Sequence, residues 1–138
     1  MMLKSFDNSL SALKGATVDV LPGNGYPEPG QASIIMRFSN GALLTAEFWR
    51  IVEGGKAGVS SFDHQQKYGL PAPIDAQSVV KQLLHDKGVV DARLQPETGD
   101  LLFEFTGEVS LQVFNFTGYE IWEMRFPDGT GEYSNYAK

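Results

Sequence analysis

Apolar residues recur at helical spacing in two segments of the chain. The first is residues 5–14, where Gly15 supplies a residue able to end a helix in the left-handed conformation. The second is residues 75–87, where Asp75 is a good N-cap and Gly88 is expected to end the helix. The stripes are formed by Phe6, Leu10 and Leu13 in the first segment, and by Ala76, Val79, Val80, Leu83 and Leu84 in the second.

Most of the remaining chain alternates apolar and polar residues, which is typical of half-buried antiparallel strands. Asn40-Gly41 predicts a type I′ hairpin turn, with Phe38 across from Leu43 and Ile35 across from Ala46. The predicted strands are residues 16–21, 33–39, 42–52, 59–62, 89–95, 100–106, 109–114 and 119–126.

These elements predict an α+β fold. We expect a twisted or partly rolled antiparallel sheet of six to eight strands, with the helix of residues 75–87 packed on one face and a short N-terminal helix. Residues 1–138 are expected to form a single domain, and residues 127–138 an extended or flexible tail.

Composition narrows the classes of function. The chain has 138 residues, of which 42% are apolar and 20% charged, as in globular proteins. It has no cysteine, which excludes disulfides, thiolate nucleophiles and cysteine zinc sites. The net charge of −6 argues against nucleic-acid binding and favours a basic protein partner. No apolar run is long enough for a membrane helix or follows a basic start as in a signal peptide, so we expect a cytoplasmic protein.

Asp63 and His64 are the strongest candidates for chemistry. A histidine oriented by a carboxylate acts as a general base or metal ligand, and Glu47 or Glu120 could complete such a site. The alternative is a loop histidine that hydrogen-bonds the backbone. The nucleophile-elbow, phosphate-loop, HExxH and calcium-loop patterns are absent, so we predict no metal and no cofactor, and an enzyme is the less favoured interpretation.

The chain has two Trp, five Tyr and nine Phe residues, more than a small acidic domain needs for its core. Trp and Tyr side chains often dominate protein interfaces. The alternative is that most of these aromatic residues lie in the core. The candidate binding residues are therefore Asp63, His64, Tyr68, Trp49, Tyr119, Glu120 and Trp122.

Several short motifs carry a resemblance to a known group of proteins. They are Asp63-His64-Gln65-Gln66-Lys67-Tyr68-Gly69, a helix opening at Asp75, Thr98-Gly99-Asp100-Leu101, Leu111-x-Val113-Phe114 and Tyr119-Glu120-x-Trp122-Glu123. Over residues 30–130 the chain resembles small bacterial domains of unknown function that are similar to the immunity proteins encoded beside polymorphic toxins. The resemblance implies a non-enzymatic bacterial domain that neutralises a toxin, and it supplies no catalytic residues.

Three hypotheses follow. The leading one is an acidic, non-enzymatic domain that covers a basic partner. The second is a small-molecule binder with an apolar pocket lined by Phe103, Phe105, Phe114 and Trp122. The third is a hydrolase-like enzyme that uses Asp63 and His64. A free sheet edge would also allow a homodimer.

Overall fold

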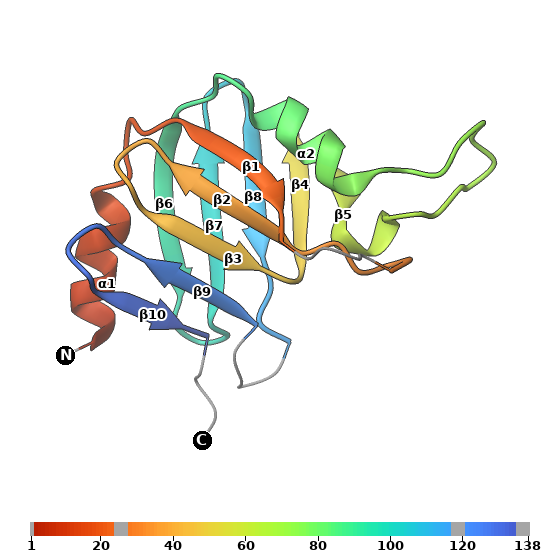
Figure 1. The fold of residues 1–138 in the computed structure, drawn as a ribbon. Coiled ribbons are helices and arrows are strands. Elements are labelled where there is room, and N and C mark those ends of the chain that lie inside the picture. Colours follow the sequence, from red (N-terminus) through yellow and green to blue (C-terminus); the bar gives the residue numbers. More distant parts are fainter. Residues whose placement is uncertain (1, 24–27, 117–120, 135–138) are drawn as a thin grey trace.

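The computed structural model describes residues 2–23, 28–116 and 121–134, and they form two five-stranded antiparallel sheets (Figure 1). The first sheet has the order β1-β2-β3-β9-β10 and the second the order β5-β4-β8-β7-β6. The strands of the first sheet are β1 (Val18–Pro22), β2 (Ile34–Phe38), β3 (Leu43–Ala46), β9 (Trp122–Arg125) and β10 (Gly131–Tyr133). Those of the second are β4 (Trp49–Glu53), β5 (Lys56–Ser60), β6 (Val89–Gln95), β7 (Asp100–Phe105) and β8 (Val109–Val113).

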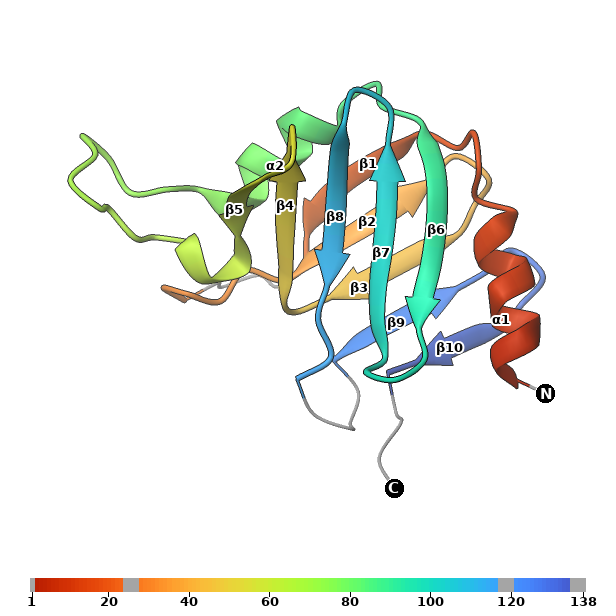
Figure 2. The same ribbon diagram turned by 180° about the vertical axis from the view of Figure 1, so that it is seen from behind.

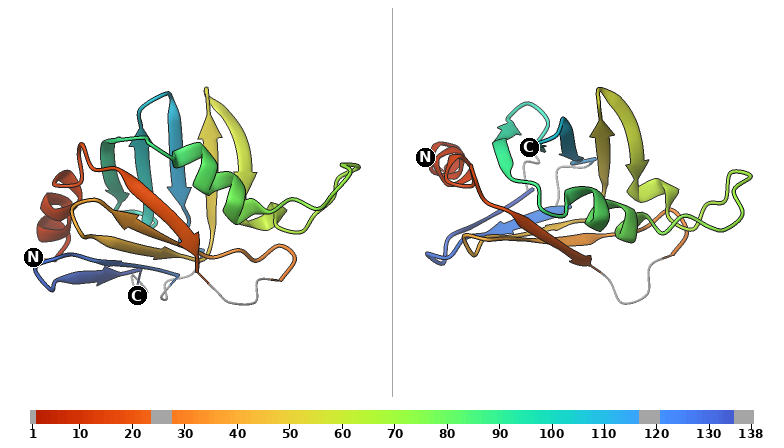
Figure 3. Two further views of the ribbon diagram at one scale, coloured as in Figure 1. Left: turned by 45° about the horizontal axis from the view of Figure 1, so that its top comes forward. Right: turned by 90° about the horizontal axis from the view of Figure 1, so that it is seen from above.

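The two sheets form two layers around one apolar core, and the helices close the sides of the sandwich (Figure 3). Helix α1 (Met2–Ser11) contacts β6, while α2 (Ala76–Leu84) contacts β1 and β5, the edge strands on the other side. A short 3₁₀ helix, η1 (Ser61–Asp63), follows β5. The largest fully buried side chains of the core include Trp49, Trp122, Phe38, Phe103 and Ile34.

The α+β class with antiparallel strands is confirmed, but the prediction of a single sheet with a helix on one face is wrong. The predicted strand of residues 42–52 divides into β3 and β4, which belong to different sheets. Ala42, Leu44 and Ala46 are buried, and burial then resumes at Trp49 and Ile51. This change of phase means that the chain turns a corner after Ala46, so that β3 and β4 bury side chains into the same core from opposite layers.

The two predicted helices are present, with shorter bounds. Asp75 caps α2 as predicted, because its Oδ1 accepts a hydrogen bond from the Ser78 backbone N–H at 3.1 Å. The predicted end at Gly88 is wrong, since α2 ends at Leu84 and Asp86 takes the left-handed conformation, with φ +61°. After α1, Gly15 has φ +86° and donates to the Val89 carbonyl oxygen at 2.8 Å, which fastens the end of the helical segment to β6.

The Asn40-Gly41 hairpin forms, but its turn and register differ from the prediction. A type I′ turn needs positive φ at both central residues, whereas only Gly41 has it, at +98°. The Gly41 N–H donates to the Phe38 carbonyl oxygen at 2.9 Å, which closes a turn one residue longer than expected. Leu43 therefore pairs with Arg37 instead of Phe38, and the side chains that face the core follow from this register.

The segment after residue 126 contributes an edge strand to the first sheet. β10 pairs with β9, with Glu132 opposite Met124, and Glu132 is buried. The described part of the expected tail, residues 127–134, is thus a turn followed by an extended strand.

An ion pair fastens α2 to the first sheet and makes stability depend on pH. Lys81 Nζ donates to Asp19 Oδ1 at 2.8 Å and to the Val20 carbonyl oxygen at 3.1 Å. The hydrogen bond from Lys81, with its charge, lowers the pKa of Asp19 below the ordinary 3.8. Since the folded-state pKa is depressed, this contribution to stability is present above the unfolded-state pKa and is lost as pH falls through the folded-state value.

We therefore expect Lys81→Met to reduce the free energy of unfolding more at neutral pH than well below pH 3.8, because protonated Asp19 no longer pairs with Lys81 and only the hydrogen bond to the Val20 carbonyl oxygen remains to be lost. Urea unfolding of both proteins at the two pH values measures this. Lys87→Met, which removes a cation for which the structure records no ion pair among the described residues, is the control. An equal loss from Lys81→Met at both pH values would contradict the assignment.

Candidate functional site

Asp63 lies at the end of η1 and binds its own turn. Its Oδ2 accepts from the Ser60 backbone N–H at 2.8 Å, while the Ser60 hydroxyl accepts from the Phe62 N–H, so the two residues form a capping box. Its Oδ1 accepts from the Tyr68 hydroxyl at 2.9 Å. That bond, with the nearby carboxylate charge, raises the pKa of Tyr68 above its ordinary value of 10.0. Two of the candidate binding residues, Asp63 and Tyr68, are thus hydrogen-bonded to each other.

His64 is buried, with 2% of its surface exposed. Its Nδ1 accepts from the Ala76 backbone N–H at 3.1 Å, at the first residue of α2. Nε2 therefore carries the proton, and among the described residues it has no hydrogen-bond partner. The arrangement matches the backbone-bonding alternative, since Asp63 and His64 are directed to different backbone groups. Glu47 is exposed in the β3–β4 connection, and Glu120 lies outside the described residues.

The two tryptophans are in the core. Trp49 Nε1 donates to the Ala32 carbonyl oxygen and Trp122 Nε1 to the Gly99 carbonyl oxygen, each at 2.7 Å. Phe6 stacks on Trp122 with ring centroids 5.7 Å apart. The indoles accordingly serve packing rather than the surface, and the candidate Tyr119 lies outside the described residues.

The side chains of the expected apolar pocket do not share one face. Phe103, Phe105 and Trp122 are buried between the sheets, where Phe103 packs on Phe38. Phe114 continues the alternation of β8 after buried Val113 and is half-exposed on the opposite, outer side of the second sheet. The four residues therefore do not line a common cavity.

Residues 64–75 form a protruding loop between η1 and α2 (Figure 2). Its base is held by two backbone hydrogen bonds, from Gln65 N–H to the Ile74 carbonyl oxygen and from Ile74 N–H to the Gln66 carbonyl oxygen. Tyr68 and Leu70 are exposed on it, by 67% and 47%. The loop therefore begins directly after two anchored residues, Asp63, which caps η1, and His64, which is buried.

The outer face of the second sheet is not covered by either helix (Figure 2). A cluster of four phenylalanines, Phe48, Phe62, Phe114 and Phe116, lies at the end of this face where β4 begins and β8 ends. We call it the phenylalanine cluster. Phe48 is 5.5 Å from Phe62 and 5.1 Å from Phe116, and Phe116 is 5.7 Å from Phe114, between ring centroids. Phe62 and Phe116 are 46% and 56% exposed, so the cluster presents apolar surface to solvent.

Arg50, the second residue of β4, lies next to the phenylalanine cluster on this face. Its Nε and Nη2 donate to Gln112 Oε1 at 2.8 and 2.5 Å, and its guanidinium carbon lies 5.2 Å from the centre of the Phe114 ring. Arg50 and Gln112 are directly opposite each other on β4 and β8. The amide and the ring together hold the guanidinium in one orientation.

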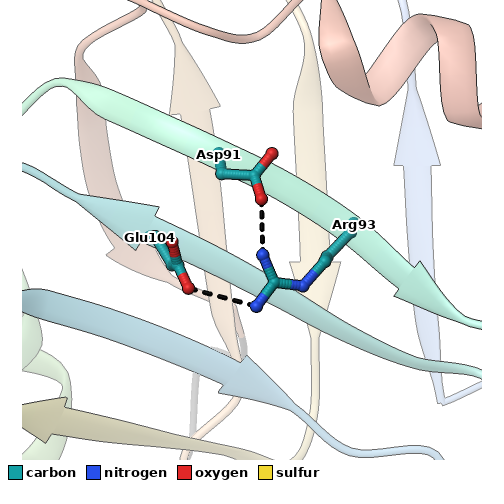
Figure 4. Close-up of polar contacts among 3 residues, drawn as sticks. All are labelled: Asp91, Arg93 and Glu104. Carbon is teal, nitrogen blue, oxygen red and sulfur yellow. Dashed lines mark hydrogen bonds and ion pairs between the residues drawn. The ribbon is translucent and has the colours of Figure 1, made fainter. Parts of the chain in front are cut away.

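The far side of the face carries a second arginine with different partners (Figure 4). Arg93 on β6 donates to Asp91 at 2.5 Å and to Glu104 at 3.1 Å. The hydrogen bond to Asp91 and the charge of Glu104 raise the pKa of Arg93 above its ordinary value. Arg93 is therefore neutralised within the protein, whereas Arg50 has an uncharged partner.

Two shallow hollows lie along the outer face. One, of about 340 Å3, is lined by residues that include Leu102, Gln112 and Phe114, and the other, of about 460 Å3, by residues that include Val52, Glu104 and Glu108. No group of three or more metal-ligating side chains occurs in the described part of the chain. In that same part, no helix has the length and apolar character needed to cross a membrane.

Comparison of the chain with protein-family models, with curated proteins and with solved structures finds no match. The function is therefore argued from the surface of the molecule.

Sequence reasoning missed the phenylalanine cluster and Arg50. A signal was present, because Phe114 and Phe116 occupy the outward phase of β8, which Ser110 and Gln112 otherwise fill with polar side chains. Phe48 lies two residues before Arg50 on the outward phase of β4. Because residues 42–52 were predicted as one continuous strand, Phe48 and Arg50 could not be assigned to the outward side of a second sheet.

We expect Asp63→Ala to lower the free energy of unfolding by about 1 kcal/mol, the usual cost of a lost cap, and to accelerate amide exchange in the protruding loop. Tyr68→Phe, which keeps the cap and removes only the exposed hydroxyl, is the matched control and should change stability little. Urea unfolding and hydrogen exchange measure both effects. Equal stability of Asp63→Ala and wild type would show that the capping box contributes nothing.

Proposed function

We propose that this chain is a non-enzymatic protein-binding domain, and that its binding surface is the outer face of the second sheet around the phenylalanine cluster. The observation that carries the proposal is the pair of exposed rings, Phe62 and Phe116, stacked on Phe48 and Phe114 at the open face of a sheet. Large aromatic side chains are strongly enriched at the energetic centres of protein interfaces.

The geometry of the phenylalanine cluster supports this role. Each ring contacts at least one other ring at 5.1–5.8 Å, so the side chains are held in place before a partner arrives. A preorganised surface loses less side-chain entropy on association. Burial of these rings by a partner would gain about 25 cal/mol per Å2 of apolar surface removed from water.

Charge supports a basic partner. At the other end of the same face, exposed Glu108 lies in the turn between β7 and β8, and its carbonyl oxygen accepts from Gly54 N–H. Glu104 borders the hollow at this end. A partner with an apolar patch and basic residues beside it complements both ends, and a bacterial toxin with a basic active site, covered by an immunity-type domain, is the specific form of this proposal.

The other two hypotheses receive less support. Asp63 accepts from Ser60 and Tyr68, while His64 Nδ1 accepts from the first residue of α2, so the two side chains do not form a catalytic pair. The four residues of the expected apolar pocket, Phe103, Phe105, Phe114 and Trp122, are divided between two faces of the second sheet and the core.

The first test removes the exposed rings. We expect the double variant Phe62→Ser/Phe116→Ser to bind a partner at least about tenfold more weakly, because hot-spot aromatics contribute 2 kcal/mol or more each. The probes are purified, catalytically inactivated basic bacterial toxin domains, measured by biolayer interferometry. Tyr133→Ser, which removes a similarly exposed aromatic ring from β10, is the control. Unchanged binding by the double variant would reject this surface.

The second test concerns the acidic end. Glu108→Lys should slow association with a basic partner, and the difference from wild type should shrink at high salt because screening shortens the reach of surface charge. Asp7→Lys changes the net charge equally but lies on α1, at a different side of the molecule. If both variants slow association to the same extent, net charge rather than this face governs the encounter.

A further inference from the structure

Arg50 differs from the other arginines of the chain. Arg93 pairs with Asp91 and Glu104, and Arg125 pairs with Glu123. Arg37 is directly opposite Asp19 on the neighbouring strand, and its charge helps to lower the pKa of that carboxyl. Arg50 has no ion pair with a described carboxylate, although the chain carries six more acidic than basic residues.

The immediate surroundings of Arg50 are neutral and aromatic. Nε and Nη2 converge on the single oxygen Gln112 Oε1, and Nη1 makes no hydrogen bond to a described residue. The side chain is half-buried beside the ring of Phe114. A charge that is partly removed from water beside apolar groups is costly unless an opposite charge meets it.

We propose that Arg50 is a recognition residue for a carboxylate of the partner protein, the side chain of an Asp or Glu that is flanked by apolar residues. The guanidinium has an unoccupied Nη1 and the second N–H of Nη2, which suit the two oxygens of a carboxylate. The apolar neighbours of that carboxylate would then lie on the phenylalanine cluster. This inference rests on the proposed function and adds the chemistry of one partner group to it.

A side-chain carboxylate fits this place better than a chain terminus. Terminal carboxylates are captured by nests of free backbone N–H groups. β4 lies between β5 and β8 in the sheet, so its backbone is paired on both sides, and Arg50 is opposite Ser60 on one side and Gln112 on the other. The donors available to a carboxylate at this place are therefore side-chain N–H groups. The face is open, so an acidic side chain that protrudes from a partner can reach them.

The position of Arg50 would also fix the orientation of the partner. The face carries acidic side chains at Asp91, Glu104 and Glu108, which repel a carboxylate placed at that end. An acidic side chain of the partner is therefore favoured at the Arg50 guanidinium itself rather than next to Asp100, which lines the hollow beside Phe114, and basic side chains are favoured at the other end. Such an alternation specifies register as well as attraction.

The test uses short peptides as probes, so that it does not depend on a natural partner. N-acetyl-Phe-Glu-Phe-amide is titrated into the 15N-labelled full chain and followed by NMR, with N-acetyl-Phe-Gln-Phe-amide as its neutral match. We expect the Glu peptide to bind about five- to tenfold more tightly, the range of a partly exposed charge-assisted hydrogen bond. N-acetyl-Phe-Gln-Phe with a free C-terminus should show no such gain.

Variants assign the preference to Arg50. Arg50→Gln should bind both capped peptides equally, Arg50→Lys should retain part of the preference because it keeps the charge without the planar fork, and Arg125→Gln, on the other sheet, should behave as wild type. Each variant is first shown to be folded by its NMR spectrum.

Three results would overturn the inference: no peptide binding up to millimolar concentration, equal binding of the Glu and Gln peptides by wild type, or an equal loss of preference in Arg50→Gln and Arg125→Gln. A stronger gain from the free C-terminus than from the Glu side chain would also overturn it. If the Gln peptide binds and Phe62→Ser/Phe116→Ser abolishes that binding, the protein-binding surface stands without the carboxylate site.

Discussion

The structure depends on one constraint, the burial of the ten short strands that the described residues form against a single apolar core. Most of these strands alternate buried and exposed side chains, and helices α1 and α2 are too short to cover a wide sheet, so two sheets cover each other. The change of burial phase between Ala46 and Trp49 carries the chain from the first layer to the second. After this change of layer, the alternation of side chains along each strand determines which of them face solvent.

The outward positions of the second sheet carry the residues on which the proposed function rests. Core packing explains Trp49, Ile51, Leu111 and Val113, which alternate with outward residues on β4 and β8. Core packing does not explain the outward phenylalanines, because a polar residue at an exposed position would be compatible with the same core. Their mutual stacking and the ring beneath Arg50 indicate a surface held ready for contact, in keeping with the proposed function.

Local rules predicted local structure well. Asp75 capped its helix because the hydrogen bond involves only residues three apart, and the alternation in residues 89–95 gave the bounds of β6 as observed. The number of sheets could not be derived, because pairing between β3 and β9 or between β4 and β8 joins residues more than fifty positions apart. Asp63 and His64 were considered as a possible catalytic pair because the sequence does not show where each side chain points, and the fold directs Asp63 to Ser60 and Tyr68 and His64 to the Ala76 N–H.

The electrostatic design of the outer face follows from these long-range pairings. β6 and β7 bring Asp91 and Glu104 to Arg93, and this triad is complete within the chain. β4 and β8 bring Gln112 and Phe114 to Arg50, which orients the guanidinium without neutralising it. The two arginines of this face therefore differ. Arg93 is paired with carboxylates of the chain, whereas Arg50, among the described residues, keeps an unpaired positive charge beside an apolar surface. In an acidic protein, a fixed and uncompensated cation at that place favours recognition of an opposite charge over stabilisation of the fold.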